Sequence, residues 1–324
     1  MDSLDAQAKA RVVQAQLANN SSLTKVKQKM QRINKRRRGL SALLTMFILL
    51  MTTNYATGFY RSFITEVSML KINLLLLGLL LVFGFRIFNP PSLAKLYRKH
   101  FFKPTFNLIF PKASILYTDT GNDATDEQET LTTITPYARK YAIIYESNCY
   151  IQFGDVWQTK FCNLHAMIKG FQGRNTTAFW GQVFKRTLPT PPQGKLRLVP
   201  KNYFLGRERQ GGHPKAVANE IKIELQNRTF NDHYNVYCSD EQTARNLLSP
   251  PIQSELVRWA TVCPIYLVIE GSSLILSFYT GQFVFQTPKD KEGVEALSYE
   301  SEYRKIVDAL RGSCRLLDDL CEVL

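Results

Sequence analysis

The chain is organised by two apolar runs, GLSALLTMFILLMTTNYATGFY at residues 39–60 and INLLLLGLLLVFGFRIF at residues 72–88. About a dozen residues, some of them charged, separate the two runs. A helix of 17 residues, the length of the second run, is about 25 Å long and spans the apolar core of a bilayer when its end residues reach outward. The pair therefore predicts an N-terminal transmembrane helical hairpin with spans at about 39–60 and 72–88.

The two runs differ in how strongly they predict a span. The second holds thirteen Leu, Ile, Val or Phe residues, and at roughly −0.3 to −0.6 kcal/mol for each its insertion is clearly favourable. The first is interrupted by Thr52, Thr53 and Asn54, so it reaches full length only with residues 55–60. The alternative is a buried helical pair in a soluble protein, and whether the first run fully spans the membrane stays open.

Positive charge is concentrated on both sides of the hairpin. Residues 1–38 carry ten Lys or Arg and two Asp, and residues 86–112 carry six Lys or Arg and no acid. These flanks contribute +8 and +6, which is the whole formal net charge of +14. Because basic residues favour the cytoplasmic side, both flanks and both termini are predicted to be cytoplasmic. The charge is then explained by membrane topology, and it no longer favours a nucleic-acid-binding protein.

The N-terminal segment, residues 1–38, is predicted to be basic and helical. Residues 5–18 favour a helix, and residues 19–22 are expected to break it. A second helix then carries apolar residues on one face at helical spacing, namely Leu23, Val26, Met30 and Ile33. Three alternatives stay open for this helix: it lies on anionic lipid, it joins two protomers in a short coiled coil, or it is a solvated tail that only fixes topology.

A juxtamembrane amphipathic segment, residues 89–112, follows the second run. Prolines 90 and 91 end the span, and Pro104 is expected to stop the next helix. Its apolar stripe (Leu93, Leu96, Tyr97, His100 and Phe101) either lies in the membrane interface or packs on the protein. Basic side chains on both flanks are predicted to contact the membrane surface, namely Arg36, Arg37, Arg38, Lys95, Arg98 and Lys99.

From residue 113 onward the pattern becomes that of an α+β domain with an antiparallel sheet and flanking helices, predicted over 113–297. The strand patterns fall at residues 141–145, 149–153, 160–168, 176–184, 195–199, 221–225, 234–238, 264–270, 273–279 and 282–286. Helices are predicted at 241–248 and at 250–260, with Asp240 as the N-cap of the first. A long C-terminal helix over 298–324 completes the chain.

Motifs that would indicate chemistry are weak in this sequence. The six cysteines form no C-x-x-C pair and predict reduced, buried thiols in a cytoplasmic domain. Cys162 and His165 are three residues apart, but on a strand such residues face opposite ways. The glycine-rich stretch 206–212 lacks the Lys-Ser/Thr of a phosphate loop. We therefore predict no catalytic, cofactor-binding or metal site.

One further charge feature lies inside the domain. Residues 156–215 hold eleven Lys or Arg, a single acid and interleaved aromatic residues. Such a surface binds an anionic membrane, an acidic partner or nucleic acid, or it is a solvated basic face that balances the acidic remainder of the domain. Tethering beside a bilayer favours the membrane over nucleic acid.

Residues 141–288 resemble an uncharacterised bacterial family, the domain of unknown function numbered three-one-three-seven. The resemblance rests on the phrase FNDHYNVYCSDEQTARNLLSP at residues 230–250, which matches the family's strand ending in Tyr-Ser-x-Asp, helix with Ala-Arg, and Thr-Pro. This chain departs from that pattern with Cys238 before Ser239 and with Ser249 before Pro250. The resemblance implies a bacterial inner-membrane protein with a cytoplasmic α+β domain, and it implies no known activity.

Within that phrase the residues themselves indicate structural roles. Residues 234–238 are expected to form a core strand, Asp240 a helix cap, and Arg245 a partner for a nearby acid or carbonyl. The sequence as a whole predicts a membrane-anchored cytoplasmic interaction module that binds the bilayer and a protein partner or anionic lipid, without a cofactor. The alternative is an enzyme or small-ligand receptor whose site is assembled from distant residues.

Overall fold

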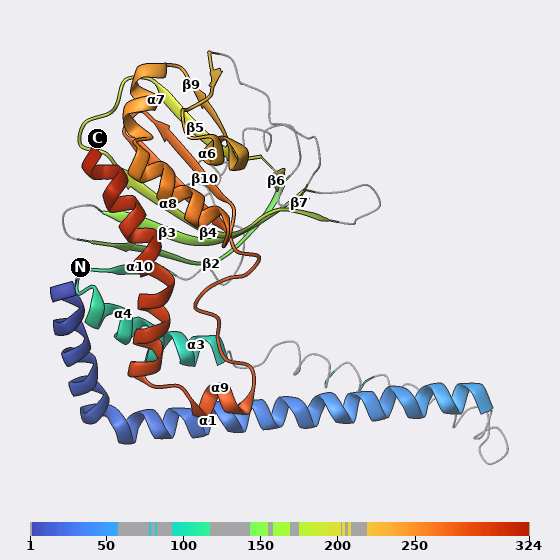
Figure 1. Ribbon diagram of the computed structural model, residues 1–324. Coiled ribbons are helices and arrows are strands. Elements are labelled where there is room, and N and C mark those ends of the chain that lie inside the picture. Colours follow the sequence, from blue (N-terminus) through green and yellow to red (C-terminus); the bar gives the residue numbers. More distant parts are fainter. Residues whose placement is uncertain are drawn as a thin grey trace. The chain divides into compact units, whose positions relative to one another are not determined.

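The computed structural model describes residues 2–57, 93–116, 143–154, 158–168, 175–201 and 219–323, together with residues 78, 82, 203–204 and 207–208. The chain divides into two compact units. The N-terminal unit comprises residues 1–109 and 287–304, and the sheet domain comprises residues 110–286 and 305–324. Figure 1 gives the element labels that are used below.

Helices build the N-terminal unit (Figure 1). The described elements are α1 (Asp2–Thr57), α3 (Leu93–Tyr97), the π-helical turn η2 (Arg98–Phe102), α4 (Lys103–Ile109), α9 (Lys291–Glu295) and the first residues of α10 (Tyr299–Val323). Lys27 on α1 donates from Nζ to the Glu295 carbonyl oxygen at 2.8 Å, and Gln31 donates to the Glu295 carboxylate at 3.1 Å. Contacts within the chain therefore fix α1 against α9.

The predicted break at residues 19–22 is wrong, because α1 continues through it. The Asn19 amide donates to the Ala15 carbonyl oxygen at 2.9 Å, and the Thr24 hydroxyl donates to that of Asn20 at 2.9 Å. These polar side chains bond back to the preceding turn, an arrangement that bends helices rather than ending them. Figure 1 shows α1 bent in this way.

The apolar face predicted on α1 is turned toward the protein. Leu23 and Met30 are buried, and Val26 and Ile33 are half-buried. The N-terminal unit itself covers much of this face, so the face is not left for lipid or for a second protomer. For residues 23–33, packing within the chain therefore takes the place of all three predicted alternatives.

The helix after the second apolar run does not stop at Pro104, contrary to prediction. Its α-helical pieces are joined by the π-helical turn, in which the Lys103 N–H donates to the Arg98 carbonyl oxygen five residues back. Such a wider turn accommodates a proline, which has no N–H for the usual helical bond. The apolar stripe is buried at Leu93, Tyr97 and Phe101. Of the two alternatives for the stripe, packing on the protein is the one observed.

A nine-stranded antiparallel sheet forms the sheet domain, in the order β1-β2-β3-β4-β11-β10-β5-β9-β8. Its strands are β1 (Ser114–Leu116), β2 (Ile143–Phe153), β3 (Thr159–Ile168), β4 (Thr176–Thr187), β5 (Lys195–Pro200), β8 (Ile221–Ile223), β9 (Tyr234–Cys238), β10 (Ile265–Glu270) and β11 (Ser273–Tyr279). β6 (Tyr203–Phe204) and β7 (Arg207–Glu208) pair separately. The helices are α6 (Arg228–His233), α7 (Glu241–Leu247), α8 (Pro250–Ala260) and the rest of α10. The mixed helical and antiparallel architecture was predicted correctly.

Helices pack on one face of the sheet, which we call the helix face. Trp259 of α8 packs against Phe278 of β11 in a tilted arrangement with ring centroids 4.9 Å apart, and Tyr234 of β9 donates to the Leu256 carbonyl oxygen of α8 at 3.1 Å. Side chains alternate along each strand, so the register assigns every strand residue to this face or to the opposite face. The opposite face carries a buried apolar cluster that includes Val183, Val268 and Ile275.

Several strands differ from their predicted form. Residues 141–145 and 149–153 were expected as separate strands, but Ile143–Phe153 is one strand with a register shift between Ser147 and Tyr150. Residues 282–286 form no strand. Instead, the Asn163 side chain donates to the Val284 carbonyl oxygen at 2.9 Å and accepts from its N–H at 3.1 Å. A single side chain thus makes the two hydrogen bonds that a neighbouring strand would have supplied.

Among the described residues, no helix combines the length and the apolar character needed to cross a membrane. α1 includes residues 39–57 of the first apolar run. The second run, residues 72–88, lies outside the described residues except for Gly78 and Val82. The predicted hairpin therefore stays a prediction.

The cysteines provide a direct check on the packing of the sheet domain. All six are buried thiols, and burial raises the pKa of the Cys314 thiol to about 12 and that of the Cys263 thiol to about 11. Because only the thiolate reacts, we expect a thiol-specific reagent at neutral pH to modify none of the six in the folded chain and all six in denaturant. Rapid modification of the native protein would contradict this packing.

Candidate functional site

The predicted membrane-contact residues all lie in the N-terminal unit. Arg36, Arg37 and Arg38 are exposed on α1, Lys95 and Lys99 are exposed on α3 and η2, and Arg98 is half-buried. The pKa of His100 is lowered by burial and then by the cations Lys99 and Lys29. One cation of α1 and one cation of η2 therefore act on the same imidazole.

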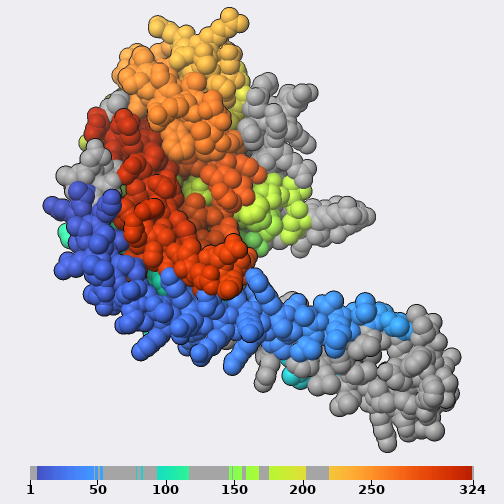
Figure 2. Space-filling view, turned by 60° about the horizontal axis from the view of Figure 1, so that its bottom comes forward, coloured from blue at the N-terminus to red at the C-terminus, as the bar shows by residue number. Residues whose placement is uncertain are grey.

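The apolar end of α1 follows directly after this basic run, and its side chains are exposed. The exposed fractions are 48% for Leu43, 53% for Met46, 47% for Ile48 and 64% for Leu49. At about 100° per residue, these four side chains point to different sides of the helix. Leu40 and Leu44, which share the remaining side of the helix, are half-buried. Figure 2 shows α1 in blue at the molecular surface.

The basic stretch 156–215 is not one solvated face, because two of its arginines are buried in ion pairs. Arg186 is 5% exposed and donates to Asp318 of α10 at 2.7 Å and to the Thr159 hydroxyl at 2.8 Å. Arg197 is 1% exposed and pairs with Glu220. Part of the charge that suggested an anionic partner therefore serves the fold.

The Arg197–Glu220 pair is the more deeply buried of the two. Arg197 donates to the Glu220 carboxylate from Nη2 at 2.5 Å and from Nε at 3.2 Å, and each side chain is 2% exposed. The guanidinium lies over the Tyr237 ring, 4.5 Å from its centroid. Arg197 is in register with Tyr237 and with Val268, which places the pair on the face opposite the helices.

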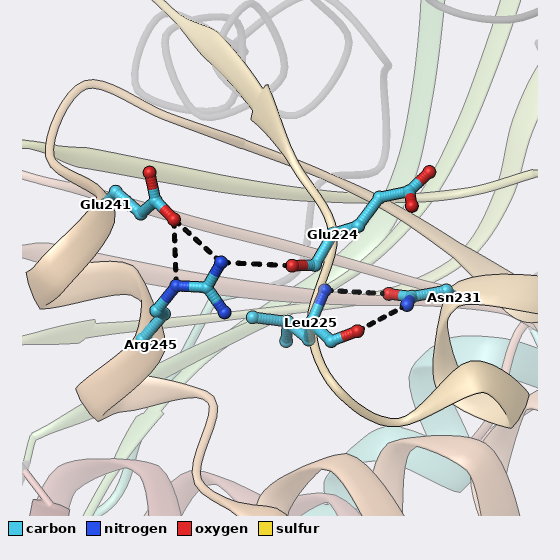
Figure 3. A network of polar contacts seen from close by, with 5 residues as sticks. All are labelled: Glu224, Leu225, Asn231, Glu241 and Arg245. Carbon is cyan, nitrogen blue, oxygen red and sulfur yellow. Dashed lines mark hydrogen bonds and ion pairs between the residues drawn. The ribbon is translucent and has the colours of Figure 1, made fainter.

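The phrase at residues 230–250 has the structural roles that its residues indicated. The strand Tyr234–Cys238 is buried throughout. Asp240 caps α7 by accepting from the Thr243 N–H at 2.8 Å. Hydrogen bonds from the Thr243 side chain and then from its backbone lower the pKa of the Asp240 carboxyl. Arg245 donates to the Glu241 carboxylate at 2.7 and 2.8 Å and to the Glu224 carbonyl oxygen at 3.2 Å (Figure 3). The predicted acid and the predicted carbonyl are both its partners.

Figure 3 also shows why the connection before β9 is not a simple turn. The Asn231 amide accepts from the Leu225 N–H at 3.1 Å and donates to the Leu225 carbonyl oxygen at 2.6 Å. Asn227 caps α6 by accepting from the Phe230 N–H at 3.1 Å. These contacts hold β8 and β9 in their antiparallel pair across a short helix, and they are structural rather than catalytic.

A different polar group connects three adjacent strands, β2, β3 and β4, which lie toward the β1 edge of the sheet. His165 of β3 lies between Glu146 of β2 and Thr177 of β4. Its Nδ1 is 3.2 Å from the Glu146 Oε2 atom, and its Nε2 is 3.0 Å from the Thr177 Oγ1 atom. The His165 side chain is 15% exposed and that of Glu146 is 57% exposed. A carboxylate, an imidazole and a hydroxyl thus form one continuous row of polar contacts.

A β-bulge places Thr177 in this group. Glu146, His165 and Trp180 are in register on the helix face. Thr177 is three residues from Trp180, a separation that would put it on the opposite face of a regular strand. The register shift between the Ala166 and Met167 pairs adds a residue to β4 and returns Thr177 to the helix face.

Aromatic rings surround His165. The Trp180 ring packs against the imidazole at a tilt of 30° with centroids 4.9 Å apart, and the Phe283 ring meets the imidazole edge-on at 6.5 Å. The Trp180 Nε1 atom is buried and has no hydrogen-bond partner in the described part of the chain. The site therefore combines a polar triad, an apolar wall and one N–H group, that of Trp180, which makes no hydrogen bond in the described part of the chain.

Sequence reasoning considered His165 only as a partner for Cys162. Both lie on β3, and their registers put them on opposite faces, as the strand pattern required. Across the described ranges, no cluster of His, Cys, Asp and Glu could hold a metal ion. The partners of His165 lie 19 and 12 residues away along the chain. No local signal connects them, because their meeting depends on strand register and on the bulge.

Comparisons with known proteins give a family match for part of the chain and no activity. Residues 177–321 match a family described as a protein of unknown function, DUF3137. This confirms the resemblance stated for residues 230–250. No curated protein matches the chain. Among solved structures, the crystal structure of the mycobacterial trehalose monomycolate transport factor A, TtfA, shares 9% sequence identity, covers 51% of this chain and 73% of its own, and has a TM-score of 0.25.

Proposed function

We propose that this chain, whose residues 177–321 form a DUF3137 domain, is a membrane-anchored interaction module. The apolar end of α1 enters the bilayer, and residues 72–88 form a second span. The sheet domain is thereby tethered beside the membrane, where it meets a protein partner or anionic lipid. The charge distribution and the family resemblance favour the bacterial inner membrane with both termini in the cytoplasm.

The exposed apolar side chains of α1 are the observation that carries this proposal. Leu43, Met46, Ile48 and Leu49 are about half exposed or more. Apolar area in water costs about 25 cal/mol for each Å², and large exposed apolar surfaces mark interaction or membrane sites. The four side chains spread over more than half of the helix circumference, so a bilayer removes this cost for all of them at once, which a partner that covers one narrow face would not do.

The basic residues next to this end support the same orientation. Arg36, Arg37 and Arg38 immediately precede the apolar run and are exposed. Each cation near an anionic leaflet contributes about 1 kcal/mol. With Lys95, Arg98 and Lys99 they form the surface that we assign to lipid headgroups.

A fluorescent probe at residue 49 tests the anchor. In Leu49→Cys, a polarity-sensitive dye attached to the new thiol is expected to show blue-shifted emission in vesicles and to be quenched by lipids with nitroxides on their acyl chains. The native cysteines are buried and leave the new thiol as the reactive one. The matched control is Leu17→Cys on the same helix, where Leu17 is 75% exposed and lies outside the apolar run.

The control probe is expected to keep the emission of a dye in water and to escape quenching. Equal, water-like emission from residues 49 and 17 would refute membrane insertion of α1. The predicted orientation has its own check: a C-terminal green fluorescent protein fusion should fluoresce, and a C-terminal alkaline phosphatase fusion should be inactive. The reverse pattern would place the sheet domain on the other side of the membrane.

A further inference from the structure

We propose that Thr177, His165 and Glu146 form a catalytic triad that transfers acyl groups from carboxylic esters to water. The proposal concerns the sheet domain and does not depend on the membrane anchor. It rests on the connected hydrogen bonds across β2, β3 and β4, on the bulge that turns Thr177 toward His165, and on an unpartnered donor beside the imidazole.

The hydrogen bonds fix which group donates and which accepts. An ionised carboxylate can only accept, so the proton between Glu146 and His165 resides on Nδ1 of the imidazole. The Nε2 atom of a neutral imidazole is then an acceptor, and the Thr177 hydroxyl must donate to it. This direction is the one that a general base needs in order to take a proton from a nucleophile.

The bulge is the second observation. β-Bulges often lie beside active sites, where they re-aim one side chain. Here the added residue brings Thr177 onto the face that carries His165 and Trp180, although the sequence spacing of a regular strand would turn it away.

The third observation is the Trp180 indole. Its Nε1–H is buried without a partner among the residues that the structure describes, and a buried donor that makes no hydrogen bond costs about 1–3 kcal/mol. Its ring packs against the His165 ring. In the proposed site, this N–H donates to the carbonyl oxygen of the ester as that oxygen becomes negative.

The reaction takes two steps that share one proton carrier. The Thr177 Oγ1 atom attacks the ester carbonyl carbon while its proton moves to His165 Nε2. The bond to the alkoxy oxygen breaks, that oxygen takes the proton from Nε2, and the alcohol leaves an acyl-threonine. Water then attacks the acyl carbon, gives a proton to Nε2 and releases the carboxylic acid, and Nε2 returns the proton to Thr177. Glu146 positions the imidazole throughout.

The surroundings indicate the class of ester. The rings of Trp180 and Phe283 border His165, with centroids 6.2 Å apart, and they offer an apolar surface for the acyl chain. The carboxylate of Glu146 is more than half exposed, so solvent reaches this side of the triad. We infer an ester with a short apolar acyl group, for which p-nitrophenyl butyrate is the probe.

The experiment uses the full chain in detergent. The wild type is expected to release p-nitrophenol, and a fluorophosphonate probe should add to residue 177, located by peptide mass spectrometry. Thr177→Val keeps the shape but removes the hydroxyl, and His165→Asn removes the base. Each is expected to lower hydrolysis by at least about 100-fold, and Trp180→Phe by on the order of 100-fold. Thr177→Ser should retain labelling and hydrolysis.

Matched controls separate chemistry from folding. Thr187→Val changes the same residue type at the exposed end of the same strand and is expected to keep full activity. Circular dichroism and the urea midpoint should be alike for the valine variants at 177 and 187. Absence of hydrolysis and labelling in the folded wild type would overturn the proposal. So would hydrolysis that a folded Thr177→Val chain retains, or labelling at another residue.

Discussion

Replacement of Glu220 by alanine is expected to lower the free energy of unfolding of the sheet domain by about 3–5 kcal/mol. The change leaves the Arg197 guanidinium without the carboxylate that accepts two of its hydrogen bonds. Arg197 is 1% exposed on a central strand, so water does not readily replace the lost partner. A buried charge that loses its carboxylate costs much more than an exposed one.

Urea unfolding followed by tryptophan fluorescence measures this loss. The three tryptophans are at positions 157, 180 and 259, all of them in the sheet domain. Glu241→Ala is the matched control, because it breaks a contact of similar length to Arg245 between half-exposed side chains and should cost no more than about 1 kcal/mol. The double variant Arg197→Met/Glu220→Leu should regain most of the stability. Equal losses in Glu220→Ala and Glu241→Ala would contradict the role of burial.

The replacement of Gly181 by alanine is the second large effect that we expect. Gly181 lies on β4 and pairs with Tyr279 of β11. A Cβ atom at residue 181 would overlap the backbone carbonyl of Phe278 on that neighbouring strand. Backbone of a central strand cannot move aside as a side-chain end can, so the two strands must separate locally. We expect a loss of at least about 3 kcal/mol, or failure to accumulate folded protein.

Gly271→Ala provides the comparison for this position. Gly271 lies between β10 and β11, and no atom comes within 4 Å of its would-be Cβ. Its φ of 57° leaves only the cost of a left-handed residue, about 1–2 kcal/mol. Urea midpoints of the two variants should differ accordingly. A Gly181→Ala chain as stable as the Gly271→Ala chain would show that β4 and β11 are not packed as closely as described.

Local patterns predicted most elements of the sheet domain. The hairpin of β10 and β11, the helix that starts at Pro250 and the cap at Asp240 are each encoded within a few residues, so spacing and turn chemistry sufficed. The order of the strands was not predicted. The pairing of β4 with β11 joins residues about 90 positions apart, and no local pattern specifies such a partner.

The N-terminal unit shows a different limit. Asn19 and Pro104 were taken as helix breakers from their intrinsic preferences, yet one bonds back to its own helix and the other follows a π-helical turn. Tertiary packing of Leu23, Met30 and Tyr97 outweighs those preferences. The membrane-contact set at 36–38, 95, 98 and 99 stays a prediction that the probe at residue 49 addresses in part.

The candidate site was out of reach of the sequence for a geometric reason. Glu146, His165 and Thr177 come from three strands, and two register irregularities precede their meeting. A one-residue error in either register would turn Thr177 or Glu146 to the other face. A pattern search that assumes regular alternation therefore assigns these residues to different sides of the sheet.

The strand order also bears on how the protein is made. β10 and β11 lie between β4 and β5, yet they follow both in the chain. A ribosome that releases the chain from its N-terminus has completed residues 114–238 before residues 265–279 emerge. Until then β4 and β5 each present an unsatisfied edge on which other nascent chains could add. The two parts of the sheet can join only after the hairpin of β10 and β11 has been synthesised. We therefore expect the yield of folded protein to depend on synthesis rate and chaperone supply more than on the final stability.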